Sequence, residues 1–345
     1  MRAFLTSPRS QFDSRHRRLL GSDIGRRPTM LRIEVLLTEN ELAEQCLAAL
    51  RNRYLPEKLF YWFPLSVRAW LNLCKSAAPY RNFSRSYELI QKHAVEIARQ
   101  LTGPSAKELE VVGLGAGQGD KDLLVLEALR AEGAKVSYQP VDSSQALLEI
   151  ALGSAASNRF PACGLKADLA DPRTAKALAA SAGGPRLYLV VGNTLGVTGP
   201  VQFLEMLRLV LRPEDRVLVD GEIFDEQGTM AGYDNPVNRQ FAFAPLASVG
   251  LEEGRDGELV FESRADAGLD GLRLVSKHFR AARSLEIRLA AERVTLSPGE
   301  KVDMSSSYKY SRDAFLRMLR EAGGLDSLAE YVSDDRHFVM VFARP

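Results

Sequence analysis

Cysteine is scarce in this chain, and its scarcity narrows the kinds of site that the sequence can form. The chain has three cysteines, Cys46, Cys74 and Cys163, none with the Cys-x-x-Cys spacing of a zinc or redox motif. Scattered cysteines are typical of a reducing compartment, so we expect a cytoplasmic protein. The four histidines are equally isolated: His16, His93, His278 and His337. None has metal-ligand or nucleophile–base spacing, and we predict no metal and no triad.

Long apolar runs and an excess of one charge are also missing. No stretch of about 18 apolar residues occurs, so the sequence predicts no membrane span. The 45 basic and 44 acidic side chains give a net charge of +1, which argues against binding to nucleic acid. Apolar residues make up 46% of the 345, enough for the core of one large domain or two modest ones. We expect a small-molecule partner, and the oligomeric state stays open.

The first thirty residues differ in composition from the rest. They contain seven arginines and two acids, and they lack the apolar core of a secretion signal. We expect residues 1–30 to form a disordered leader. A targeting segment is one alternative, and a translation start at Met30 is another.

A glycine-rich turn between a strand and a helix is the most informative feature of the sequence. Val111, Val112 and Leu114 form an apolar run typical of a buried strand, and a helical repeat of leucines begins at Leu123. Glycine occupies alternate positions between them: Gly113, Gly115, Gly117 and Gly119. Because glycine lacks Cβ, a ligand can lie against this backbone at the start of the helix. No Gly-Lys-Ser/Thr follows, so the turn predicts a nucleotide-like cofactor in a doubly wound sheet, not a Walker A loop.

Two acids that follow later strands are candidates for contacts with this cofactor. Asp142 lies 23 residues beyond Gly119, at the end of the strand over residues 136–141, where an acid in this fold accepts hydrogen bonds from a ribose diol. Asp168 follows a third apolar segment and is placed to accept from an adenine amino group. The alternatives are a helix-capping or loop acid for Asp142 and a solvent-exposed turn acid for Asp168.

Lys121 bears on the identity of the cofactor. A cation in the first turn of a helix is unfavourable, because the helix dipole is already positive there. A carboxylate on the ligand would offset this, and a surface pair with Asp120 or Asp122 is an equal alternative. The loop has no second cation for a pyrophosphate, so S-adenosylmethionine fits better than NAD. An NAD-dependent oxidoreductase remains the less favoured alternative.

Strands and helices alternate over much of the chain, which predicts an α/β fold with a mostly parallel sheet and right-handed crossovers. Capped helices are expected over residues 38–53, from Thr38, and over residues 143–152, from Ser143. Further helices are expected over residues 84–99 and 201–211. The strands over residues 187–191 and 216–220 complete this pattern. The first of them ends in Gly192 and Asn193, which we expect to border the cofactor.

The pattern changes after about residue 225. Short alternating runs there predict an antiparallel insertion with strands over residues 259–263, 272–279, 285–289 and 294–296. A helix from Ser311 and a last strand over residues 337–342 then return to the first pattern.

Aromatic residues are concentrated between residues 54 and 83. They are Tyr54, Phe60, Tyr61, Trp62, Phe63, Trp70, Tyr80 and Phe83. Aromatic faces suit a sulfonium or ammonium cation, although ordinary core packing is the alternative for most of them. The hydroxyls of Ser305 and Ser307 precede the last helix, where they either join the site or belong to a turn.

Several of these stretches together resemble one family, the histidine-specific S-adenosylmethionine-dependent methyltransferases. The resemblance runs from about Leu55 to the C-terminus. It is carried by Lys58-Leu59-Phe60-Tyr61, Ser84-Arg85-Ser86, the loop from Gly113 to Lys121, Pro140-Val141-Asp142, Gly192-Asn193-Thr194-Leu195-Gly196, Gly232-Tyr233-Asp234 and Tyr308-Lys309-Tyr310-Ser311-Arg312. The resemblance implies a Rossmann-like class I methyltransferase domain, residues 86–225 plus 306–345. It also implies a second, α+β substrate-binding domain, residues 31–85 plus 226–305, with the substrate amine between the two.

The resemblance implies roles for single residues as well. For the cofactor S-adenosylmethionine, the implied or expected contacts are Gly113, Gly115, Gly117, Lys121, Asp142, Asp168, Gly192 and Asn193. Tyr61 is expected beside the substrate amine as the catalytic residue, orienting the amine or taking its proton through water. Tyr233 is expected to hold the substrate carboxylate, and Phe243 to be an aromatic wall of the pocket.

Two positions depart from the family pattern. Val197 stands where the family has an asparagine that binds the substrate amine or carboxylate, and Ser305 stands where it has a glutamate that binds imidazole. Losing a charged contact of this kind costs about 1.5–3 kcal/mol or more. The sequence therefore predicts an N-methyltransferase for a small amine or amino acid other than histidine, held in part by Ser305 and Ser307. The alternative is a catalytically degenerate protein that only binds S-adenosylmethionine.

Overall fold

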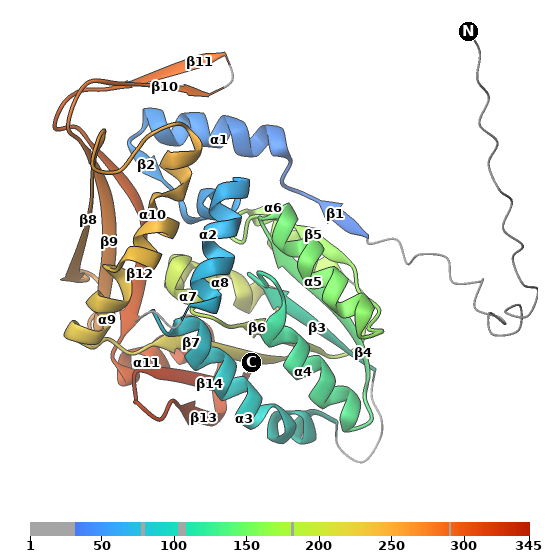
Figure 1. The fold of residues 1–345 in the computed structure, drawn as a ribbon. Helices are drawn as coiled ribbons and strands as arrows, with labels where there is room; N and C mark the ends of the chain where they lie inside the picture. Colours follow the sequence, from blue (N-terminus) through green and yellow to red (C-terminus); the bar gives the residue numbers. More distant parts are fainter. Residues whose placement is uncertain (1–31, 77–79, 103–107, 181–182, 290) are drawn as a thin grey trace, which may run out of the picture. The chain divides into compact units, whose positions relative to one another are not determined.

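The strands that alternate with helices along the chain form one eight-stranded sheet (Figure 1). The computed structural model describes residues 32–76, 80–102, 108–180, 183–289 and 291–345. In spatial order the strands of this main sheet are β1 (Ile33–Val35), β5 (Gly164–Lys166), β4 (Lys135–Asp142), β3 (Glu108–Leu114), β6 (Arg186–Val190), β7 (Arg216–Glu222), β14 (Phe338–Arg344) and β13 (Asp326–Val332). The first six run parallel, and β14 and β13 run antiparallel to their neighbours. The mostly parallel sheet is confirmed.

The strand order reverses at β3. The chain runs from β3 outward to β4 and β5, and then returns to the other side of β3 with β6 and β7. The carboxyl ends of β3, β4 and β6 therefore border a crevice of the kind in which open α/β sheets bind ligands.

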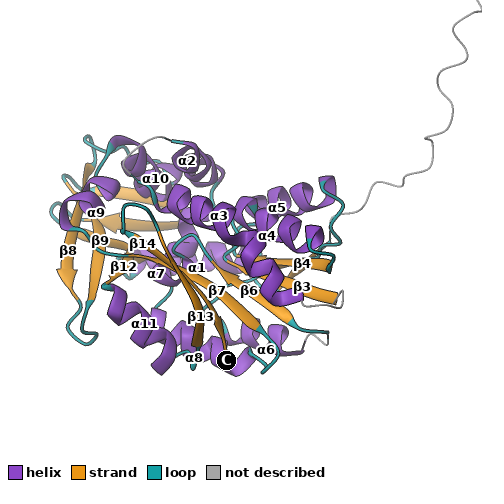
Figure 2. Ribbon diagram, turned by 90° about the horizontal axis from the view of Figure 1, so that it is seen from below, coloured by secondary structure: helices purple, strands orange, loops and turns teal. Residues whose placement is uncertain are grey.

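Helices cover both faces of the main sheet (Figure 2). One face packs against α3 (Asn82–Thr102), α4 (Asp120–Ala131) and α5 (Gln145–Ser157), and the other against α6 (Pro172–Ala180), α8 (Pro200–Val210) and α11 (Arg312–Glu321). Successive strand residues point to opposite faces. Val111 accordingly packs in the apolar cluster under α3, α4 and α5, and Val112 packs in the cluster under α6, α8 and α11.

One predicted helix cap is confirmed and one is wrong. Thr38 begins α1 (Glu39–Arg51) with a full capping box, in which Glu41 is the acidic partner. The cap of α5 is Ser144, whose hydroxyl accepts from the amide of Leu147, and not Ser143. The reason is that the Asp142 carboxylate accepts from the amide of Ser144, at 2.9 Å, which lengthens the turn by one residue.

A second sheet forms a separate layer. Its strand order is β2 (Tyr54–Leu55), β12 (Lys301–Tyr310), β9 (Leu272–Ala281) and β8 (Gly257–Ala265), with a hairpin of β10 (Leu285–Leu289) and β11 (Glu292–Leu296) nearby. It shares an apolar core with α1, η1 (Glu57–Tyr61), α2 (Pro64–Lys75) and α10 (Pro236–Ser248). The short helix α9 (Glu226–Tyr233) leads from the main sheet into this layer.

The two sheets are connected through β12. Tyr310 at its end forms a bridge with Ile223, and its carbonyl accepts from the amide of Phe224 at 3.0 Å. Residues 32–345 belong to a single compact unit. The division into two domains stays a prediction, and β1 departs from it because Ile33 pairs with Gly164 and so extends the main sheet. The leader predicted for residues 1–30 lies outside the described residues.

Candidate active site

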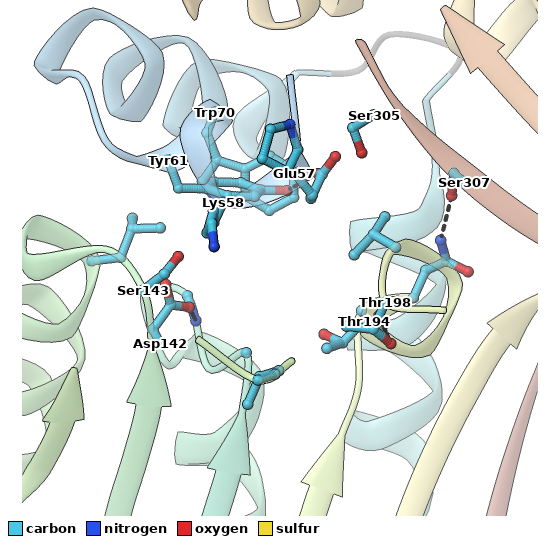
Figure 3. Close-up of a pocket in the computed structure, with 18 of the residues that line it drawn as sticks. Glu57, Lys58, Tyr61, Trp70, Asp142, Ser143, Thr194, Thr198, Ser305 and Ser307 are labelled. Atoms are coloured by element: carbon cyan, nitrogen blue, oxygen red, sulfur yellow. Dashed lines mark hydrogen bonds between the residues drawn. The ribbon is translucent and has the colours of Figure 1, made fainter. Parts of the chain in front are cut away.

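A cavity of about 770 Å³ lies at the carboxyl ends of β3, β4 and β6 (Figure 3). The main sheet contributes the loop over residues 115–121, Asp142 and residues 191–194. The other wall comes from η1, α2, α10, β9 and β12, and from α7 (Thr194–Val197). The volume is in the range of small-molecule sites.

The glycine loop has the backbone conformation that its sequence predicts. Gly115 and Gly117 have φ of +68° and +57°, which disfavour any residue with a Cβ. A Cβ at Gly115 would approach Thr194 Cγ2 to 2.7 Å, whereas at Gly117 it would meet nothing within 4 Å. Gly115 thus allows two loops to meet, and Gly117 leaves the cavity floor open. Gly113 does not line the cavity, because it lies within β3 against the buried Asp122.

Asp142 lies at the floor of the cavity, at the end of β4. Its Oδ2 accepts from the amide of Gly117 and its Oδ1 from that of Ser144, both at 2.9 Å. A carboxylate has about four lone-pair sites, so two remain for a ligand. Burial raises the pKa of Asp142, and the backbone hydrogen bonds oppose that rise. A carboxylate held in place and only half satisfied suits a diol.

Lys121 faces the cavity without a counter-charge. Its Nζ lies 4.2 Å from the centroid of the Phe83 ring, and a Cβ on Gly192 would lie 2.9 Å from the same nitrogen. Asp120 and Asp122 each accept from another side chain. Among the described residues no carboxylate lies within ion-pair distance of Lys121, so the surface-pair alternative does not describe this lysine.

Asp168 is in the cavity wall but already has a partner. Its carboxylate forms an ion pair with Lys58 of η1, and both side chains are about one-fifth exposed, at 20% and 19%. The pair connects η1 to the loop after β5. Asp168 is therefore neither a freely exposed turn acid nor an unoccupied acceptor.

Gly192 and Asn193 are held by a buried acid of the next strand. The amides of Gly192 and Asn193 donate to the two carboxylate oxygens of Asp220, at 2.8 and 2.7 Å. Asn193 has φ of +65°, and its side chain donates to the hydroxyl of Ser307 at 3.1 Å (Figure 3). Both residues line the cavity. The side-chain amide of Asn193 also connects the end of the main sheet to β12 through its bond to Ser307.

Tyr61 belongs to an aromatic group on the far side of the cavity from Asp142 (Figure 3). The centroid of its ring lies 5.3 Å from that of Trp70 and 5.6 Å from that of Phe241. Its hydroxyl donates to Glu57 Oε1 at 2.8 Å. Burial, and then the nearby Glu57 charge, raise the pKa of Tyr61 well above its usual value. Tyr61 therefore stays a neutral phenol, and Glu57 is the carboxylate that its hydroxyl contacts.

The predicted substrate residues converge on one wall. Val197, Tyr233, Ser305 and Ser307 all line the cavity, and Ser305 lies where the pairing of β12 with β9 shifts register. The Ser307 hydroxyl accepts from Lys309 Nζ at 2.8 Å and bonds with the Tyr233 side chain. Burial raises the pKa of Tyr233 well above its usual value.

Phe243 is not part of the cavity lining, in contrast to its predicted role. It packs inside the second core, with its ring centroid 5.8 Å from that of Phe279. The aromatic wall on α10 is Phe241, because two helical residues two positions apart point in nearly opposite directions.

Glu57, Lys58 and Lys277 are charged lining residues to which the sequence assigned no role. Lys58 begins the Lys-Leu-Phe-Tyr stretch and Glu57 directly precedes it, so this stretch gave a signal for their location. A lysine within an alternating strand is ordinarily solvent-facing, so nothing in the sequence pointed to Lys277.

Two kinds of feature are absent from the described residues. No helix there is long and apolar enough to cross a membrane. No group of three or more histidine, cysteine, aspartate or glutamate side chains is placed to hold a metal ion in the same part of the chain.

A parallel sheet whose order reverses at a glycine loop, with a half-satisfied acid at the next strand end, defines the Rossmann-like nucleotide-cofactor proteins. Within this class the chain belongs to the histidine-specific, S-adenosylmethionine-dependent methyltransferase family, whose model matches residues 41–345.

The similarity to individual proteins of known function or structure is low. The chain is 26% identical over 219 residues to the histidine N-alpha-methyltransferase of Mycobacterium tuberculosis (strain CDC 1551 / Oshkosh). This match covers 59% of the chain and 60% of the relative's length. A solved methyltransferase from Clostridium acetobutylicum is 12% identical, with coverage of 77% and 95% and a TM-score of 0.42. The 1,6-didemethyltoxoflavin-N1-methyltransferase of Burkholderia thailandensis is 13% identical, with coverage of 74% and 77% and a TM-score of 0.38.

The site fits the family's cofactor, S-adenosylmethionine. Gly117 leaves open space above the loop, and Asp142 keeps lone pairs for ribose hydroxyls. Lys121 is a cation that lacks a carboxylate partner among the described residues. A diol and a carboxylate on one ligand would satisfy both groups.

Proposed function

We propose that this protein transfers methyl groups from S-adenosylmethionine to the nitrogen of a small amine or amino acid other than histidine. One observation carries the proposal: the predicted cofactor residues and the predicted substrate residues line a single cavity. We call the part formed by Val197, Tyr233, Ser305 and Ser307 the acceptor wall. In this wall Val197 and Ser305 stand where the family has residues that bind histidine. Valine has no polar atom for an amine or carboxylate, and serine has no charge for imidazole.

In this proposal the chain's residues bind and align the two reactants. The glycine loop and Asp142 hold the ribose, and Lys121 meets the carboxylate of the cofactor. When bound, S-adenosylmethionine supplies an electrophilic methyl group on a sulfonium sulfur. Tyr61, Trp70 and Phe241 offer aromatic faces to the cation and exclude water.

The acceptor nitrogen needs a free lone pair, so an ammonium must first lose a proton. Because the Tyr61 hydroxyl donates to Glu57, its oxygen is free to accept from the substrate N–H. The nitrogen proton passes to Tyr61 Oη as the Tyr61 proton passes to Glu57 Oε1. Proximity and orientation do the remaining work.

The test is a methyl-transfer screen of the full chain with S-adenosylmethionine and a library of amines and amino acids, read by mass spectrometry. We expect turnover of some amine and little or none of histidine. Efficient trimethylation of histidine would overturn the substrate proposal. Binding of S-adenosylhomocysteine without turnover of any amine would favour the degenerate alternative.

A constructive variant tests the same idea from the other direction. Val197→Asn combined with Ser305→Glu restores the polar residues at both positions. We expect histidine affinity to rise, by up to about 3 kcal/mol for a desolvated charged contact, or less where the pocket does not support the new groups. An unchanged histidine affinity in the folded variant would mean that these two positions do not read the substrate.

A further inference from the structure

Lys277 is a partly buried cation on the acceptor side of the cavity, and it has no role in the proposed reaction. It lies on β9 opposite Met304 of β12, beside the register shift at Ser305. Both Lys277 and Ser305 line the cavity. Figure 3 shows Ser305 and Glu57 across the cavity from Asp142, so this wall faces the acceptor and not the ribose site.

The contacts of Lys277 leave part of its ammonium unsatisfied. Its Nζ donates to the Ser305 carbonyl at 3.2 Å and lies 4.4 Å from the centroid of the Phe60 ring. An ammonium has three N–H donors, and these neutral contacts do not balance its charge. Burial lowers the pKa of Lys277, the direction expected for a cation that has lost water without gaining an anion.

No carboxylate of the described residues completes this site. The Glu57 charge acts on Lys277 and raises its pKa, but Glu57 is not within ion-pair distance of Lys277 and already accepts from Tyr61. Of the other lysines in the lining, Lys58 is paired with Asp168, and Lys121 faces the cofactor end.

We infer that Lys277 binds a carboxylate of the methyl acceptor, so that the substrate is an amine that also carries an acid group. This inference rests on the proposed function for the presence of an acceptor. A carboxylate is favoured over a phosphate, because Lys277 offers a single uncompensated positive charge: Lys309, the next cation of this wall, is already paired with Glu222. The acid of the substrate would lie against Lys277 and the Ser305 wall, with its amine at Tyr61.

The experiment compares acids with their neutral amides, which have nearly the same shape. The probes are aspartate with asparagine, glutamate with glutamine, and phenylalanine with phenylalaninamide. Each is titrated calorimetrically into the full chain saturated with S-adenosylhomocysteine, and each is assayed for methyl transfer. The variants are Lys277→Met, which removes the charge, Lys277→Arg, which keeps it, and Lys301→Met, a control at an exposed lysine of the neighbouring strand.

We expect at least one acid to bind more than tenfold tighter than its amide in the wild-type protein and in Lys301→Met. Lys277→Met should abolish this preference, and Lys277→Arg should keep part of it. All variants should bind S-adenosylhomocysteine as the wild type does, which also verifies folding. Amides that bind as tightly as acids, or a preference that survives in Lys277→Met, would overturn the inference.

The two proposals fail in different ways. If acids bind through Lys277 and no amine is methylated, the carboxylate site stands and the proposed activity falls. If amines are methylated without any preference for acids, the activity stands and the carboxylate site falls.

Discussion

At the scale of single residues, Asp142 is the side chain on which we expect cofactor binding to depend most. It combines burial, two backbone hydrogen bonds and two remaining acceptor sites at the cavity floor. Its position at the end of β4 was predictable, because an acid one strand beyond a glycine loop has few other uses in this fold.

Replacing Asp142 should weaken the binding of S-adenosylhomocysteine. We expect Asp142→Ala to lose about 1.5–3 kcal/mol of binding free energy, the cost of charge-assisted hydrogen bonds. Calorimetric titration measures this loss. Because alanine also leaves the amide of Gly117 without its partner, Asp142→Asn serves as a milder variant with an oxygen that still accepts. Unchanged affinity in both variants would exclude a ribose contact.

Glu57 is the residue-scale test of the proton path. In the proposed path Glu57 acts through the Tyr61 hydroxyl, which it orients and from which it accepts a proton. We expect Glu57→Gln to lower kcat by about 100-fold, the lower end of acid–base contributions, with a small change in the KM of the acceptor. Steady-state kinetics on the best amine of the screen separates the two constants. A raised KM with an unchanged kcat would assign Glu57 to substrate binding instead.

At the scale of secondary-structure elements, Asp122 joins the first turn of α4 to β4. It is 1% exposed and accepts from the Tyr138 hydroxyl at 2.6 Å. Burial raises the pKa of Asp122 to about 6. A pKa raised on folding means that the ionised acid destabilises the native state, fully above about pH 6 and not at all below about pH 4.

Asp122→Asn should therefore stabilise the protein at neutral pH. From the shift of 3.8 to about 6 we expect a gain of about 3 kcal/mol at pH 7, shrinking as the pH falls through this window. Asparagine keeps an oxygen for the Tyr138 hydroxyl. Urea denaturation of both proteins across the window gives the difference. A variant that is less stable than wild type by the same amount at every pH would contradict this expectation.

At the scale of the whole molecule, a buried ion pair connects the two sheets behind the cavity. Lys309 of β12 lies 2.8 Å from Glu222 of β7, with side chains 0% and 4% exposed. Asn82 of α3 also donates to Glu222, and Lys309 donates to Ser307 in the cavity wall. The pair thus joins three elements that are far apart in the chain and supports the acceptor wall.

Replacing one partner of this pair should destabilise the fold more than replacing both partners. We expect Lys309→Met to destabilise the protein by about 3–5 kcal/mol, because Glu222 would keep an unpaired buried charge. Adding Glu222→Gln to the same chain should recover much of the loss. Urea midpoints of the single and double variants measure both effects. A single variant as stable as wild type would mean that water or another group neutralises Glu222.

Local patterns in the sequence were sufficient to predict the main sheet, the glycine loop, the position of Asp142 and the family. A buried strand, a glycine turn and a capped helix each leave a signal within a few residues, and the order of such signals along the chain defines the topology. For the same reason the position of Lys121 was predictable, although its freedom from Asp120 and Asp122 was not.

The acceptor wall was decided only by the tertiary structure. Phe241 replaces Phe243 because the rotation of α10 depends on its packing against α2 and η1, and a change of two positions reverses the face. Glu57 and Lys277 meet around one cavity although 220 residues separate them in the chain. The charge balance of a site depends on distances between such segments. The sequence alone therefore determined the family and its cofactor, and only the folded structure decided which charged groups face one another around the cavity.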